Sequence, residues 1–191
     1  MKPLMACTFN LWHEYKLLDK NIRRDILSKL TSHKFSKNEI ILKEGEVCSG
    51  IYIVWRGCCR SFIKNRGEEV TTAFSINGNL SFVATSFFQQ IPSNEYIQTI
   101  EETSCYFLSH ENLNILLDKY TMFGNFIKRI YERMLMNEVD VGNLIRSQNA
   151  LQRYKNFMKT TPEILQRVPL KYLASFLGMS QETLSRMRNR I

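Results

Sequence analysis

The residue types near the C-terminus have the spacing of a helix-turn-helix motif. Pro169 can begin a helix, since its fixed φ suits the first turn, and an apolar-periodic segment follows it. Ala174 is small where two helices would cross closely, and Gly178 stands where a tight turn needs a left-handed residue. Ser180 has the side chain of a typical N-cap for a second helix. The apolar residues expected to form the seam between the two helices are Leu173, Leu177, Met179, Leu184 and Met187.

The second helix of this motif would present polar side chains that can bond to the edges of DNA bases. Arginine can bond a guanine through two hydrogen bonds, glutamine can bond an adenine, and glutamate can accept from a cytosine amino group. The outward face of this helix would be made by Gln181, Ser185 and Asn189, with Glu182, Arg186 and Arg190 beside it. Near the helix N-terminus these side chains could reach base edges in a major groove. Three basic residues have no obvious base to read and are expected to contact phosphates: Lys171, Arg188 and Arg190. The full set of predicted DNA-binding residues is Lys171, Ser180, Gln181, Glu182, Ser185, Arg186, Arg188, Asn189 and Arg190.

The net charge of the chain is concentrated in the same segment. The formal net charge is +8. Residues 145–191 carry nine Lys and Arg against two Glu, whereas residues 1–144 carry 17 basic and 16 acidic residues. Such an asymmetry is typical of a module that binds a polyanion, although a solubilising tail would have the same charge.

The middle of the chain has the pattern of an antiparallel β sandwich or barrel. Glycines at positions 45, 57, 67 and 78 are separated by 12, 10 and 11 residues, and short β-rich runs lie between them. The expected strands include 40–42, 51–55, 70–74, 96–100 and 105–108, with a short helix within 81–90. Residues 12–30 have helical spacing and are expected to form one or two short helices before the strands.

Helical periodicity returns after the strands. A short amphipathic helix is expected over Glu111–Tyr120, with Ser109 as its cap, and a long helix over Thr121–Ser147. The apolar residues of the long helix recur in alternating steps of four and three, which predicts a coiled-coil seam between two copies of the chain. The alternative is a helix packed on its own β domain. The predicted dimer interface is Phe123, Ile127, Ile130, Met134, Asn137, Val141 and Leu144.

Together these patterns predict an α+β chain in three parts. An antiparallel, jelly-roll-like β-roll with N-terminal helices would occupy residues 1–118, and a dimerisation helix would occupy 119–147. A C-terminal helix-turn-helix domain would occupy 148–191.

A β-roll with glycines at these intervals, followed by a long helix and a C-terminal helix-turn-helix, resembles the Crp/Fnr family of bacterial transcription regulators. In the β part the resemblance rests on Phe35–Glu39, Lys43–Glu46 and Ile51–Gly57. In the C-terminal part the segments that look like the short Bacteroidetes-type members are Arg153–Tyr154, Thr161–Glu163, Arg167–Leu170 and Ala174–Gly178. The resemblance implies a β-roll like a cyclic nucleotide-binding domain and a cytoplasmic homodimer that regulates transcription at a two-fold symmetric site on double-stranded DNA. In this resemblance the family's base-reading residues fall on Gln181, Glu182 and Arg186, and RNA polymerase would be a further partner. The family's β-hairpin wing is expected to be missing, because the sequence ends directly after the second helix of the motif. No membrane is expected as a partner.

The resemblance also implies an effector pocket, but this chain departs from the family there. In members that bind cyclic nucleotides, a Gly-Glu pair holds the ribose and an Arg followed by Ser or Thr holds the phosphate. The corresponding positions fall near 79–85 and 93–94, and no Lys or Arg occurs from Gly67 to Asp118. Because a phosphate in a partly closed pocket needs a charged partner, cyclic AMP is not expected to be the effector, and no cofactor is predicted. The pocket is expected to bind a neutral ligand or none, and its candidate residues are Asn79, Leu80, Ser81, Thr85, Ser93 and Asn94.

Other classes of protein fit the sequence less well. The five cysteines form no CxxC pair, which indicates free thiols in a reducing compartment rather than an iron–sulfur or other metal site; Cys58 and Cys59 are the pair to test for a redox role. Neither a nucleophile–base constellation nor a set of strand histidines occurs, so no catalytic activity is predicted. No apolar run of about 18 residues indicates a spanning helix. The main alternative is a regulatory protein whose helix-turn-helix binds a partner protein instead of DNA.

Overall fold

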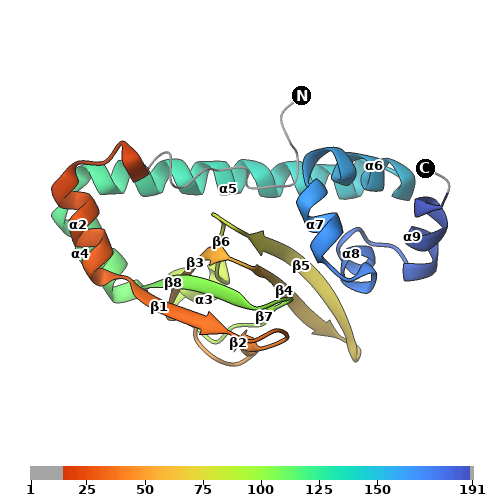
Figure 1. Cartoon of the computed structure of the whole chain (residues 1–191), viewed down its shortest axis with the longest axis horizontal. Helices are drawn as coiled ribbons and strands as arrows, with labels where there is room; N and C mark the ends of the chain where they lie inside the picture. The colour runs from red at the N-terminus through yellow and green to blue at the C-terminus, as the bar shows by residue number, and fades with distance from the viewer. Residues whose placement is uncertain (1–14, 190–191) are drawn as a thin grey trace.

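The computed structural model describes residues 15–189 and folds the β-rich part of the chain into two antiparallel four-stranded sheets (Figure 1). The first sheet has the strand order β1-β8-β3-β6 and the second the order β2-β7-β4-β5. The strands are β1 (Thr31–Phe35), β2 (Ile40–Leu42), β3 (Gly50–Arg56), β4 (Cys58–Asn65), β5 (Glu68–Ile76), β6 (Leu80–Ser81), β7 (Tyr96–Thr99) and β8 (Thr103–Ser109). The predicted β-roll is therefore confirmed.

Glycine turns connect these strands where the sequence predicts them. The backbones of Gly45, Gly57, Gly67 and Gly78 all have positive φ values. At Gly57, where φ is 125°, a side chain would overlap with Thr103 of β8, so only glycine fits between these strands. The five predicted strands all form, and β1, β4 and β6 are additional. The sequence of β4 has no apolar alternation, because the polar residues Arg60 and Ser61 occupy buried positions in this strand.

One hydrophobic core contains residues of both sheets and of the helices that cover the first sheet. These helices are α2 (Lys20–Lys29), α4 (His110–Lys119) and the first half of α5 (Thr121–Ser147), and the short helix α3 (Ala84–Gln89) contributes Phe87. The hydroxyl of Ser109 accepts a hydrogen bond from the backbone N–H of Asn112 at 3.1 Å, and this confirms the predicted cap of α4. The core thus fixes the start of α5 on the β-roll.

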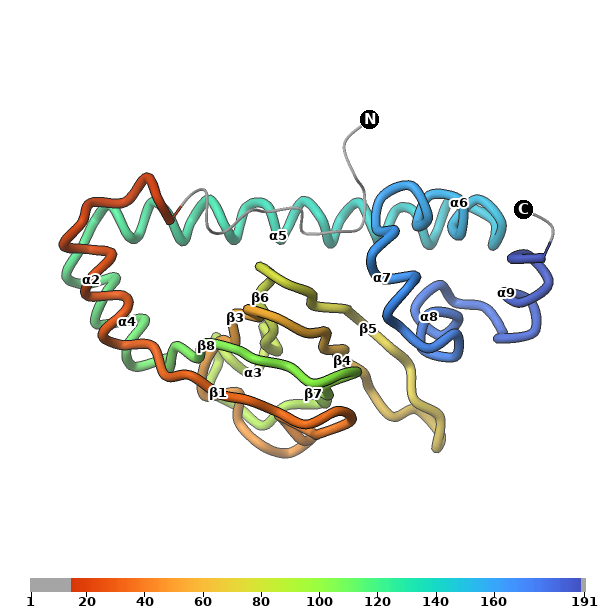
Figure 2. Tube along the Cα trace, in the orientation of Figure 1, coloured from red at the N-terminus to blue at the C-terminus, as the bar shows by residue number. Residues whose placement is uncertain are grey.

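The long helix α5 runs past the β-roll to the C-terminal helices (Figures 1 and 2). Its predicted coiled-coil seam needs correction, because four of the seven residues are buried within their own chain. Phe123, Ile127 and Ile130 are 1%, 8% and 2% exposed in the core of the β-roll, and Leu144 is 2% exposed in a second core. The alternative of a helix packed on its own domain holds for these residues. The apolar residues of α5 that stay exposed include Leu135, Met136, Val139 and Ile145.

The second core joins the C-terminal helices to the β-roll. The helices are α6 (Ala150–Thr160), α7 (Pro162–Arg167), α8 (Leu170–Phe176) and α9 (Gln181–Arg188). Three side chains of the β-roll, Cys58, Ile76 and Ile100, share this core with the helical residues Leu144, Tyr154, Phe157, Ile164, Val168, Leu173, Ala174, Leu177 and Leu184. The C-terminal helices therefore pack against the outer face of the second sheet. In the described part of the chain, none of the helices is long and apolar enough to span a membrane.

Candidate nucleic-acid interface and ligand cavity

Helices α8 and α9 form the helix-turn-helix that the sequence predicts. Gly178 has a φ of 65°, in the left-handed region, and the N–H of Met179 donates to the carbonyl of Ala174 at 3.0 Å to close the turn. Ala174 is 1% exposed where the helices cross. The hydroxyl of Ser180 accepts from the N–H of Thr183 at 3.2 Å, so the predicted N-cap is present. The direction of α9 is thus determined by a short local segment.

Arg153 of α6 holds this turn from outside. Its Nε donates to the carbonyl of Leu177 at 2.8 Å, and its two terminal nitrogens donate to the carbonyls of Gly178 at 3.2 Å and Gln148 at 2.7 Å. One guanidinium therefore satisfies carbonyls at the end of α8 and after α5. Its donors are occupied within the protein, so this basic residue has a structural role.

The outward face of α9 presents the predicted base-reading side chains to solvent. Gln181, Glu182 and Arg186 are all exposed. The remaining predicted DNA-binding residues are exposed at Lys171, Ser180, Arg188 and Asn189 and half-buried at Ser185, while Arg190 lies outside the described residues. The hydroxyl of Ser180 serves as the helix cap. The structure therefore brings the described members of the set onto the surface of one small domain, as the motif requires.

Glu182 is held in its ionised form at the start of α9. Its pKa lies below the ordinary value because the backbone N–H of the helix terminus, the Ser180 hydroxyl and the nearby Arg186 all favour the carboxylate. An ionised carboxylate is an acceptor only, which suits the amino group of cytosine and repels a phosphate.

A buried arginine connects the helix-turn-helix to the β-roll. Arg60 of β4 is 1% exposed, and its guanidinium lies between two rings, 3.6 Å from the ring centre of Tyr172 and 4.1 Å from that of Phe62. It forms an ion pair with Glu69, and its Nε and Nη2 donate to Oε1 of Gln98 at 3.0 and 2.7 Å. Tyr172 belongs to α8 and the other residues to the β-roll, so this charge is buried only when the two parts are in contact.

Helix α8 also contacts the edge strand β5 directly. The hydroxyl of Ser175 accepts from the N–H of Thr71 at 3.0 Å and donates to the carbonyl of Glu69 at 3.1 Å. The rings of Phe74 and Phe176 meet edge to face with 5.2 Å between their centres. A shift of β5 would therefore move α8, and with it the exposed face of α9.

A cavity of about 540 Å³ lies beside this contact, between the β-roll and the middle of α5. Its wall comes from β4 and β5, the segment from Asn79 to Phe88, Glu95, α5, and Phe176 of α8. The lining side chains are Ser61, Thr72, Ala73, Phe74, Ser75, Asn79, Leu80, Phe82, Val83, Ala84, Phe88, Glu95, Tyr131, Met134, Leu135, Asn137, Glu138, Val141 and Phe176. A volume of this size accommodates a small organic molecule.

Two carboxylates lie in the wall of this cavity, and no Lys or Arg is among its lining residues. The hydroxyl of Thr72 donates to Oε2 of Glu95 at 2.6 Å. The pKa of Glu138 is raised, first by partial burial and then by the negative charge of Glu95. The electrostatic potential in the cavity is therefore suited to a cation or a hydrogen-bond donor.

The predicted pocket residues are only partly brought together. Asn79 and Leu80 line the cavity, and Ser81 is buried beside them with a hydroxyl that bonds to no partner among the described residues. Ser93 is buried in the loop, where its hydroxyl donates to the carbonyl of Glu95 at 2.8 Å and accepts from its N–H at 3.0 Å. The predicted residues Thr85 and Asn94 are exposed and are not among the lining residues.

The sequence predicted pocket residues only between positions 79 and 94, and it did not predict the residues of the cavity wall that come from α5 and α8. Glu138 and Phe176 come from α5 and α8, so no local motif connects them with the β-roll. Glu95 is adjacent to the predicted positions, and its side chain, rather than that of Asn94, faces the cavity.

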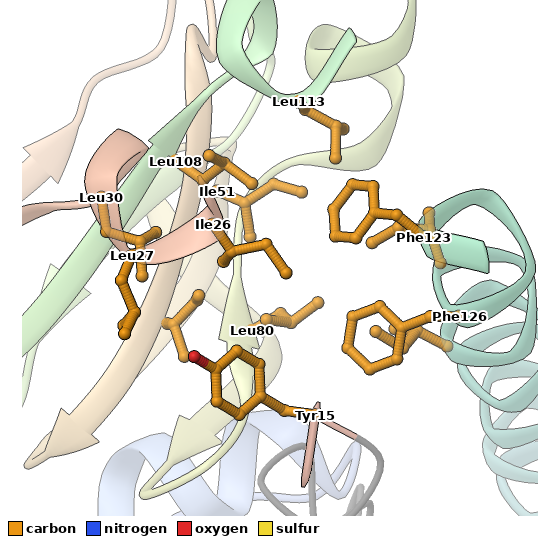
Figure 3. Close-up of a pocket in the computed structure, with 13 residues that line it drawn as sticks. Tyr15, Ile26, Leu27, Leu30, Ile51, Leu80, Leu108, Leu113, Phe123 and Phe126 are labelled. Atoms are coloured by element: carbon orange, nitrogen blue, oxygen red, sulfur yellow. The ribbon is translucent and has the colours of Figure 1, made fainter. Parts of the chain in front are cut away.

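A second cavity, of about 60 Å³, lies between α2, the first sheet and α5 (Figure 3). Phe123 and Phe126 reach it from α5, opposite Ile26 and Ile51, and its lining is apolar apart from Tyr15. An apolar void of this kind offers no partner for water or for a charged group. It is a packing space within the first core.

The cysteines of the described residues are all buried and unpaired at Cys48, Cys58, Cys59 and Cys105, while Cys7 lies outside them. Cys58 and Cys59 point to opposite sides of β4, because successive residues of a strand alternate, and they belong to different cores. A contact with the Cys105 thiol and then burial raise the pKa of Cys59, and burial raises the pKa of Cys58 to about 12. Among residues 15–189, no cluster of His, Cys, Asp and Glu side chains could hold a metal ion.

Comparisons with known proteins place this geometry in a common fold. Residues 32–120 match the family model of the cyclic nucleotide-binding domain. A search of curated protein sequences finds no match.

Three solved structures are similar over most of the chain. FixK2 from Bradyrhizobium japonicum is 19% identical, with a TM-score of 0.72 over 84% of this chain and 83% of that one. The c-di-GMP responsive global regulator CLP from Xanthomonas campestris is 16% identical, with a TM-score of 0.70 over 90% and 91%. A transcriptional regulator of the crp/fnr family from Eubacterium rectale is 17% identical, with a TM-score of 0.69 over 95% and 86%. The resemblance to Crp/Fnr regulators is thus confirmed at the level of the fold, with a cyclic nucleotide-binding-like domain in the first part of the chain.

Proposed function

We propose that this chain is a sequence-specific DNA-binding transcription regulator. The observation that carries the proposal is the exposed face of α9, where Gln181, Glu182 and Arg186 stand together while Leu184 packs on the opposite side at 0% exposure. A helix with this division between its faces can enter the major groove and be held there by its domain. The nine basic and two acidic residues of the last 47 positions would bring the domain to DNA.

The regulator would act as a homodimer on a two-fold symmetric site. Since the predicted seam is largely buried in the protomer, the face of α5 that remains for a second copy is the exposed stripe Leu135, Met136 and Val139. These positions lie on one side of the helix, because Val139 follows Leu135 by four residues and Met136 by three. Pairing along this stripe would place two copies of α9 at a defined spacing, as two half-sites require.

Cyclic AMP would not be the effector. A cyclic phosphate placed in the larger cavity would face Glu95 and Glu138, and no Lys or Arg lines the wall to pair with it. In a partly closed pocket an unpaired phosphate is strongly disfavoured. CLP is described as responsive to c-di-GMP, which is also an anion, and the same charge argument applies to that ligand here.

The test is selection of duplexes from a random pool by the purified protein, followed by titration of the selected site at several salt concentrations with and without cyclic AMP. We expect an inverted repeat, a steep dependence on salt, and no effect of cyclic AMP. R186A should weaken binding to the selected site by about 1–3 kcal/mol and relax the sequence preference at one position. K171A should weaken binding to all sequences and reduce the salt slope by about 1.

Matched variants separate these effects from a general loss of charge. K34A removes an exposed basic residue of β1 and should leave DNA affinity unchanged. V139E should convert a dimer into a monomer in analytical ultracentrifugation, whereas S32E, at an exposed position of β1 away from the stripe, should not. If no duplex is enriched and the salt dependence is weak, the helix-turn-helix binds a partner protein and the proposal is wrong.

A further inference from the structure

The larger cavity is lined by three kinds of chemical group, and each kind can contact a different part of a ligand. The carboxylates of Glu95 and Glu138 provide negative charge. The rings of Phe74, Phe88 and Phe176, together with other apolar side chains, provide apolar surface. Tyr131, which is also in the wall, has a buried hydroxyl that bonds to no partner among the described residues. This combination of an apolar body with a few polar groups is typical of small-molecule sites.

The negative charge is built into the cavity. Glu95 is held by the Thr72 hydroxyl at 2.6 Å, and its backbone is held on both sides by the hydroxyl of Ser93, which is itself 4% exposed. Glu138 approaches from the other wall, on α5. Burial and then the negative charge of Glu95 raise the pKa of Glu138, so the two negative charges in this wall repel each other. A cation between them would remove that repulsion and gain two charge-assisted hydrogen bonds.

We propose that this cavity binds a small molecule that combines an amine or guanidinium cation with an apolar body. The cation would lie between Glu95 and Glu138, and the apolar part would lie on the aromatic side chains. Its role as an effector rests on the proposed function, because a ligand that touches Phe176 would act on α8 and so on the position of α9.

The probe for this test is dansylcadaverine, a fluorescent aromatic group on a short chain that ends in an ammonium ion. Its matched anion is dansyl-6-aminohexanoate, which has the same fluorophore and ends in a carboxylate. With the full-length protein, we expect saturable, blue-shifted fluorescence with the cation and an affinity at least about 10-fold lower for the anion. The double variant E95Q/E138Q should lose this preference and still bind DNA. E68Q, an exposed carboxylate on β5 that is not among the lining residues, should keep it.

Each other outcome overturns the proposal. Equal affinities for cation and anion, or a preference that survives in E95Q/E138Q, would show that the two carboxylates do not select the ligand. Absence of saturable binding for either probe would show that the cavity does not accept such molecules. DNA binding is measured separately on the selected duplex: saturable probe binding without DNA binding would refute the proposed function alone, and DNA binding without probe binding would refute the ligand proposal alone.

Discussion

The contact between Arg60 and Tyr172 links the helix-turn-helix to the β-roll, and a double-mutant cycle would measure its strength. The two single changes are R60M, which keeps an unbranched side chain in the buried position, and Y172L, which keeps an apolar side chain on α8. The third protein carries both changes. The interactions of Arg60 with Glu69 and Gln98 are lost in both backgrounds and cancel in the cycle, so the coupling energy reports the contact of the guanidinium with the ring.

The structure predicts a large coupling for this pair. Arg60 is 1% exposed and lies 3.6 Å from the ring centre of Tyr172, so the interaction takes place largely without water. Desolvated cation–π contacts contribute about 2 kcal/mol, against about 0.5–1 kcal/mol at exposed sites. Lys171 offers a control on the same ring: its ammonium is exposed and 4.8 Å from the ring centre. The cycle of K171M with Y172L should therefore give a coupling below about 1 kcal/mol.

Urea unfolding followed by circular dichroism and by tryptophan fluorescence would provide the free energies. Because the second core includes residues of both the β-roll and the C-terminal helices, we expect one transition with both probes. The reasoning would be refuted by a coupling for Arg60 no larger than that for Lys171. Two separate transitions in the unchanged protein would also refute it, since the two parts would then unfold independently.

Three further predictions concern local features of the fold. G178A should cost about 1–2 kcal/mol in the same unfolding experiment, because φ is 65° there and the added Cβ meets only ordinary contacts; a cost near zero would contradict the left-handed turn. The pKa of Asp25 is held below its ordinary value of 3.8 by hydrogen bonds from a lysine and a tyrosine at the end of α4, so its stabilising effect is present above that pH and is lost as the pH falls through the lower folded value. D25N should thus lower the melting temperature at neutral pH, and its difference from the unchanged protein should disappear at strongly acidic pH; a constant difference would contradict the ion pair. Cys58, with a pKa raised to about 12 by burial, should resist iodoacetamide in the folded protein and react in denaturant, as peptide mass spectrometry would show; rapid labelling of the folded protein would exclude the second core as described.

Features that depend on a few neighbouring residues could be predicted from the sequence. The turn at Gly178 and the cap at Ser180 follow from the backbone that glycine permits and from the hydrogen bond that a hydroxyl can accept. The glycine turns of the β-roll follow for the same reason. These signals were sufficient for the fold class, and they located the exposed face of α9 that we propose reads DNA before any tertiary contact was known.

The helix α5 is an example of a feature that local sequence signals predict only in part. Its apolar residues recur every three or four positions, and any helix with one buried face needs that period. The period therefore predicts a buried face but does not identify what covers it. In the structure the β-roll covers Phe123 and Ile130 and the C-terminal helices cover Leu144, so the face left for a second copy is a different one.

By itself, the sequence determined the order of the elements, the helix-turn-helix and the concentration of positive charge beside it, since local backbone preference and side-chain type decide these. Only the tertiary structure decided that Arg60 is buried against Tyr172, and that Glu95 and Glu138 face one cavity with Phe176. These residues are far apart in the chain, and their contacts arise from the packing of α5 and α8 on the β-roll. The energy of a charge depends on what surrounds it, so their roles could be derived only after the packing was known.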